Sequence, residues 1–184
     1  MNVFVLNTGR CGSVTFIRAC SHISNYSAGH ESRISLAGPR RLAYPEQHIE
    51  ADNRLSWLLG RLDGAYGDRA FYVHLSRNTQ EVAGSFVRRA DFGIMKAYRE
   101  GILMGGQPGL APQDVALDYI ETVESNIRLF LRGRPNAMRF SLENAVDDFR
   151  VFWNRIGAKG DLDRATGEWS ISHNASGEPP FIHP

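Results

Sequence analysis

Two short, mostly apolar runs stand out along the chain, Val3–Leu6 and Ala70–Leu75. A continuous run of this length is typical of a strand that is buried on both faces of a parallel sheet. We therefore predict a strand at each run. Weaker patterns indicate strands that end near Gly29–Glu31 and His48–Glu50, and a last strand over Ala137–Phe140.

Segments with helical periodicity alternate with these strands. Apolar residues recur at helical spacing over about Ser13–Ser21, after Asn53, and over Thr79–Arg89, Asp114–Arg132 and Val146–Ile156. Strands and helices that alternate over short links predict an α/β fold with three layers, in which helices cover both faces of a central parallel sheet of about five strands. Ligands of such folds bind at the carboxyl ends of strands.

Two segments lack a clear period. Residues 91–112 are rich in glycine, which predicts a mobile loop or lid, and residues 157–184, which include Pro179 and Pro180, predict an irregular C-terminal tail. The length of 184 residues fits one domain, 1–184.

Composition narrows the class of function. The 21 basic and 20 acidic residues nearly cancel, so we expect no bulk binding to nucleic acid or to a membrane surface. No apolar run approaches the ~20 residues of a membrane helix. Only Lys96 and Lys159 are lysines, so anion recognition would rely on arginine, whose planar fork suits phosphate and sulfate. Cys11 and Cys20 are too few for a disulfide framework, and we expect a cytoplasmic protein.

The loop after the first strand is a candidate anion site. Asn7–Thr15 joins a predicted buried strand to a helix start, where free backbone N–H groups and the helix dipole favour an anion. Gly9 and Gly12 let the backbone approach that anion closely. Ser13 stands where a magnesium-ATP loop of the Walker A type would require lysine, so we expect neither that chemistry nor a metal site.

A second candidate follows the strand that ends near Ser76. Arg77 stands at the strand end, and Ser85 comes about two helical turns later. Together they could offer a charged fork and a hydroxyl to one phosphate ester.

In this order, the two segments resemble the nucleotide-binding motifs of the sulfotransferase superfamily. The first is similar to the 5′-phosphosulfate loop, and the second to the 3′-phosphate motif. Val14 replaces a hydroxyl residue common in the family, and Thr79 and Glu81 replace its usual proline and aspartate. The matching residues are Gly9, Arg10, Cys11, Gly12, Ser13, Val14 and Thr15 in the loop, and Arg77 and Ser85 in the second motif.

The resemblance implies a P-loop-type enzyme that binds 3′-phosphoadenosine-5′-phosphosulfate (PAPS). Such an enzyme transfers the sulfuryl group to an acceptor hydroxyl and leaves adenosine 3′,5′-bisphosphate (PAP). No motif in this sequence identifies the acceptor, whether a small molecule, a glycan or a peptide. No motif indicates the oligomeric state either. Two alternative interpretations remain. In these, the protein is either a P-loop small-molecule kinase or a catalytically silent nucleotide-binding or scaffolding protein.

The same resemblance assigns candidate catalytic residues. Arg10 would bridge the sulfate and the leaving phosphate, whose charge dominates a loose transition state. Glu31 is the first candidate for the general base, with Arg33 orienting charge, and His48 is the second. His30 stays open as well, because successive residues of an extended segment point to opposite sides. Trp169 is only a loose match to a tryptophan segment of cytosolic relatives.

Overall fold

The computed structural model describes residues 1–171 and has a five-stranded, fully parallel sheet at its centre. The strand order is β2-β3-β1-β4-β5, so the first strand is central. This confirms the predicted fold class. The strands are β1 (Val3–Leu6), β2 (Ser27–His30), β3 (His48–Ala51), β4 (Phe71–Ser76) and β5 (Ala137–Ser141).

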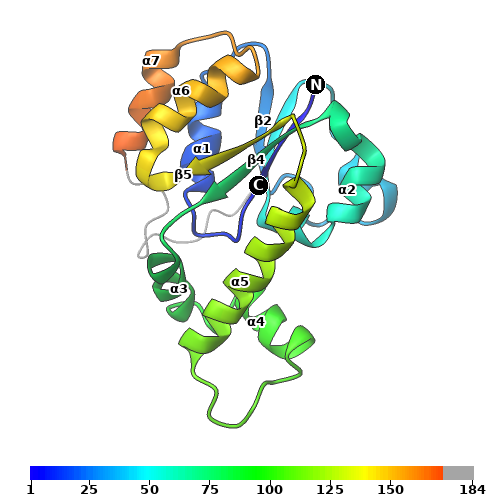
Figure 1. The fold of residues 1–184 in the computed structure, drawn as a ribbon, viewed down its shortest axis with the longest axis vertical. Coiled ribbons are helices and arrows are strands. Elements are labelled where there is room, and N and C mark those ends of the chain that lie inside the picture. Colours follow the sequence, from blue (N-terminus) through cyan, green and yellow to red (C-terminus); the bar gives the residue numbers. More distant parts are fainter. Residues whose placement is uncertain (172–184) are drawn as a thin grey trace.

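Helices cover both faces of the sheet (Figure 1). One face carries α1, α6 and α7, and the other carries α2 and α5, whereas α3 and α4 lie beyond the carboxyl edge. The bounds are α1 (Ser13–Cys20), α2 (Leu59–Tyr66), α3 (Thr79–Val87), α4 (Gly93–Ala97), α5 (Pro112–Leu131), α6 (Ala145–Arg155) and α7 (Leu162–Gly167). Within residues 1–171, no helix combines the length and the apolar character that crossing a bilayer requires.

The strands are hydrophobic because both of their faces are covered. All four residues of β1 are fully buried. On β4, Phe71 packs against Phe152 of α6, with 6.4 Å between ring centroids, while the next residue, Tyr72, packs against Phe130 of α5 at 5.2 Å. Successive side chains thus point to opposite layers, as the pleat of a strand requires.

The structure differs from two predictions in the middle of the chain. The helix predicted after Asn53 is split into a 3₁₀ helix, η2 (Asn53–Trp57), and α2, which contains Gly60 and Gly64, two poor helix formers. The predicted lid, 91–112, contains α4 and a π-helical turn, η4 (Tyr98–Ile102). Its mobility stays a prediction.

The prediction of an irregular tail is wrong for its first part. The segment after Gly157 forms α7 and a 3₁₀ turn, η6 (Glu168–Ser170). The side chain of Asp161 accepts a hydrogen bond from the backbone N–H of Arg164, which caps α7, and Gly160 pairs with Ile23 next to α1. Residues 172–184 lie outside the described part of the chain.

Candidate functional site

Two loops meet at the carboxyl edge of the sheet because β1 and β4 are paired neighbours, with Leu6 opposite His74. The loop after β1 and Arg77 after β4 therefore emerge side by side. A cavity of about 910 Å³ lies between them. Its walls contain most of the residues predicted to bind the nucleotide, namely Arg10, Gly12, Ser13, Val14, Thr15, Arg77 and Ser85.

The loop backbone is curled so that it can face an anion. Gly9, Arg10 and Gly12 have φ angles of 89°, 61° and 86°. Such left-handed residues direct successive N–H groups toward one point. Gly12 has a second reason to be glycine, since a Cβ atom there would lie 2.7 Å from Cδ1 of Leu142.

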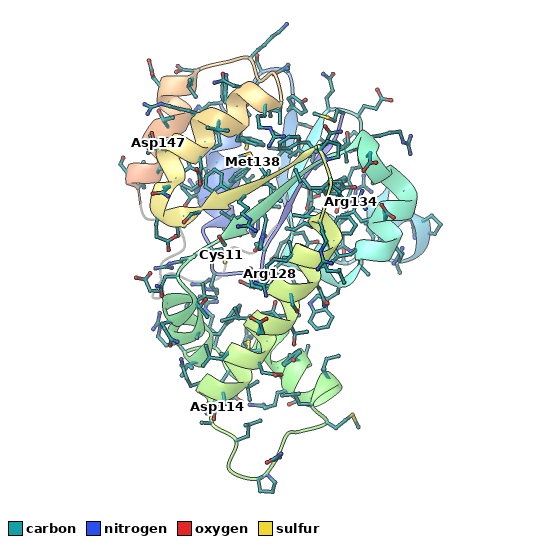
Figure 2. The ribbon with its side chains drawn as sticks, in the orientation of Figure 1. Cys11, Asp114, Arg128, Arg134, Met138 and Asp147 are labelled. Carbon is teal, nitrogen blue, oxygen red and sulfur yellow. The ribbon has the colours of Figure 1, made fainter. Side chains whose placement is uncertain are left out.

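Other elements hold this loop from the side away from the cavity. The hydroxyl of Tyr119 on α5 donates to the carbonyl of Thr8 at 2.7 Å, and Ser56 Oγ donates to the carbonyl of Asn7 at 3.2 Å. Cys11 is fully buried at the carboxyl edge of the sheet (Figure 2), and burial raises its thiol pKa to about 11. Cys11 is therefore a neutral thiol that fills space under the loop.

The N-terminus of α1 faces the cavity without a capping side chain. Its N-cap residue is Gly12, and its first turn has no acidic residue. By contrast, the Asn78 side chain caps α3 by accepting from the N–H groups of Gln80 and Glu81. The positive end of α1 is thus the better place for a phosphate group. Beside it, Ser13 Oγ is hydrogen bonded to Nε2 of His30 at 3.0 Å.

Arginine side chains gather on the far side of the cavity. Arg10 Nε donates to Ser85 Oγ at 2.8 Å, so the two predicted motifs are in direct contact. Burial lowers the pKa of Arg10, and the positive charges of other arginines lower it further. These neighbours are Arg89, Arg88 and Arg77. A bound anion would relieve this mutual repulsion.

Arg77 is engaged within the protein. Its Nε donates to Oε2 of Glu81 at 2.9 Å, and its Nη2 contacts the same oxygen. Both side chains line the cavity. Arg77 therefore lies at the cavity, and its donors already have a carboxylate partner.

The candidate bases lie in different places. His30 contacts the cavity wall through Ser13. Glu31 forms an ion pair with Nη1 of Arg54 at 2.9 Å, and it is not among the described residues that line the cavity.

The structure does not bring His48 or Arg33 to the cavity. His48 begins β3, so it lies at the opposite edge of the sheet, where it is buried between Ser27 Oγ, 2.8 Å from Nδ1, and Glu50 Oε2, 2.9 Å from Nε2. His48 is the first residue of β3, and the first residues of parallel strands lie at the edge opposite the one where ligands bind. Arg33 lies over the Tyr44 ring, 5.2 Å from its centroid.

Two further residues lie beside the site, of which Asn53 was missed from the sequence and Trp169 was only a loose match. Asn53 lies against the loop after β1, where its Nδ2 donates to the carbonyl of Thr8 at 3.4 Å. It lies two residues after Ala51, the end of β3, and that position could have revealed it. Trp169 lines the cavity, and its buried indole Nε1 makes no hydrogen bond within the described part of the chain. In residues 1–171 no group of three or more histidine, cysteine and acidic side chains could hold a metal ion.

The comparisons with known proteins agree on the fold. No family model matches the chain, and no curated protein matches it in sequence. A sulfotransferase domain from the curacin biosynthetic pathway superposes with a TM-score of 0.64 at 14% identity, over 96% of this chain and 80% of that one. The mouse sulfotransferase SULT7A1, solved with PAP, gives 0.50 at 13% identity, over 95% and 61%. The chain has the fold of the sulfotransferase superfamily.

Proposed function

We propose that this protein is a sulfotransferase that binds PAPS in the cavity and transfers its sulfuryl group to an acceptor hydroxyl. One observation supports this most strongly. The loop after β1 and the Arg77–Ser85 segment, matched independently in the sequence, line a single cavity and touch through Arg10 and Ser85. A nucleotide with phosphates on its 5′ and 3′ positions requires two such neighbouring subsites.

The residues present suit this donor. The uncapped start of α1 and the left-handed loop would hold the 5′-phosphate through backbone N–H groups. Arg77 and Ser85 would hold the 3′-phosphate through a charged fork and a hydroxyl. Trp169 also lines the cavity, and its buried indole N–H, which has no partner within residues 1–171, would be satisfied by a ligand acceptor that reaches it.

PAPS supplies an activated sulfuryl group, so the protein needs mainly to position it and to stabilise charge on the leaving phosphate. Arg10 suits this role because its guanidinium lies on the cavity wall beside the loop. For the general base we favour His30, which reaches the cavity wall at Ser13, with Glu31 as the alternative. A neutral imidazole there would accept the proton of the acceptor hydroxyl.

Two measurements test the proposal. Calorimetric titration should show binding of PAP and no comparable binding of magnesium-ATP. Incubation with sulfur-labelled PAPS and a panel of sugars, phenols and peptides should then give a labelled product. Binding of ATP alone would refute the assignment, and binding of PAP without transfer to any acceptor would indicate a nucleotide-binding protein that lacks catalysis.

Two variants separate the candidate bases. We expect His30→Gln to lower turnover at least tenfold while the Kd for PAP changes little, because a general base contributes roughly 10²- to 10⁴-fold. Glu31→Gln is the comparison on the adjacent residue. The opposite order of effects in single-turnover assays would move the role of base to Glu31.

A further inference from the structure

The contact between Arg77 and Glu81 occupies the donors that a phosphate would use. Nε and Nη2 form one edge of the guanidinium, which is the edge suited to bidentate binding of an oxyanion. In this protein, both atoms bind Oε2 of Glu81. The Glu81 side chain is 58% exposed and lines the cavity, so its carboxylate lies where it can meet an incoming ligand.

We infer that Glu81 is an internal competitor that mimics the 3′-phosphate at Arg77 and thereby weakens nucleotide binding and speeds nucleotide release. The inference rests on the proposed function. A ligand phosphate must displace the Glu81 carboxylate from Arg77. It must then bind close to the negative charge of that carboxylate on the same cavity wall. When the nucleotide leaves, the carboxylate returns to Arg77 and hinders rebinding.

Helix stability does not account for this contact. Asn78 already caps α3, and Glu81 is the third residue of the helix, where its charge favours the helix dipole whether or not it touches Arg77. Arg77 itself lies before the helix. An exposed ion pair of this kind contributes little to stability, so a ligand phosphate can displace the carboxylate.

Glu81→Gln is the most informative variant, because glutamine also suits the third position of a capped helix. It keeps the size of the side chain and removes the competing charge. We expect the Kd for PAP to fall roughly three- to tenfold, with a matching decrease in the dissociation rate, since tenfold corresponds to about 1.4 kcal/mol. The Kd for adenosine 5′-phosphate, which lacks the 3′-phosphate, should not change.

Two further variants test whether the negative charge of Glu81 causes the change in affinity for PAP. Glu81→Asp keeps the charge on a side chain that is one methylene shorter, so it should bind PAP with an affinity between those of the wild type and Glu81→Gln. Glu46→Gln is the charge-matched control, because Glu46 is exposed and precedes β3 at the opposite edge of the sheet. It should leave the affinity for PAP unchanged.

The outcomes are separable from those of the proposed function. If Glu81→Gln binds PAP no more tightly than the wild type, or if Glu46→Gln has the same effect, competition at Arg77 is refuted while the sulfotransferase assignment stands. If the wild type does not bind PAP at all, that assignment fails. In that case inorganic phosphate serves as the probe, and the competition is refuted unless Glu81→Gln binds phosphate more tightly than the wild type.

Discussion

Replacing Arg77 by alanine should weaken PAP binding through the 3′-phosphate alone. The side chain lines the cavity and offers Nε and Nη2 on one edge. Hydrogen bonds to charged groups contribute about 1.5–3 kcal/mol. Opening the exposed pair with Glu81 subtracts ~0–1 kcal/mol from that gain in the wild type.

The net loss is therefore roughly 0.5–3 kcal/mol, which corresponds to a Kd for PAP that rises about two- to 150-fold. The assay is isothermal titration with PAP and with adenosine 5′-phosphate, carried out on the wild type and on Arg77→Ala. The variant should lose affinity for PAP and keep its affinity for adenosine 5′-phosphate. The difference between the two losses isolates the contact with the 3′-phosphate.

Arg132→Ala is the control for the loss of one positive charge, because Arg132 is exposed at the end of α5. An equal loss of affinity for both nucleotides in Arg77→Ala would show a general electrostatic effect. No loss for either would remove Arg77 from the site. Both results would refute the reasoning that the strand end after β4 binds the 3′-phosphate.

Three further predictions concern the loop and the cavity wall. Gly12→Ala should lower the free energy of urea unfolding by about 1–3 kcal/mol and abolish PAP binding, because the φ of Gly12 is 86° and the new Cβ would clash with Leu142. The control is Gly64→Ala, which should not be destabilised because a Cβ has open space there. Cys11 should resist alkylation at pH 8 in the folded protein and react in urea. Because burial raises its pKa to about 11, above the value of an unfolded thiol, the free energy of unfolding should also fall as pH rises from about 9 to 11. Trp169→Phe should weaken PAP binding about two- to tenfold, because it removes the indole N–H. It also puts a smaller ring against Phe16, Phe140 and Phe149, so urea unfolding of the variant is measured alongside; unchanged affinity in titration would exclude a contact of the indole N–H with PAP.

The sequence predicted the parts of the fold that depend on local pattern. Val3–Leu6 and Phe71–Ser76 are fully apolar or nearly so because helices cover both of their faces, and that burial is visible in the residues themselves. The loop after β1 was recognisable as a candidate anion site because free backbone N–H groups at the start of a helix favour an anion, and its binding of a phosphate stays a prediction.

What the sequence could not predict depends on long-range packing. Trp169 reaches the cavity because α7 docks beside α1 through contacts such as the pairing of Ile23 with Gly160, and no local pattern encodes that docking. His48 was misplaced because its distance from the loop along the chain says nothing about which edge of the sheet it occupies. Its partner Glu50, fully buried beside it, marks a structural role that appears only once the strands are assembled.

The direct pairing of β1 with β4 has a consequence for which nucleotides this scaffold can accept. Each loop begins at the end of its strand, and backbone hydrogen bonds hold β1 and β4 about 4.8 Å apart. The first residues of the two loops therefore cannot move apart unless those hydrogen bonds break. Under the proposed function, this spacing would keep the main-chain ends of the 5′- and 3′-phosphate subsites at one separation. A change of the proposed nucleotide preference would then arise by exchange of side chains, while the main chain keeps the same separation.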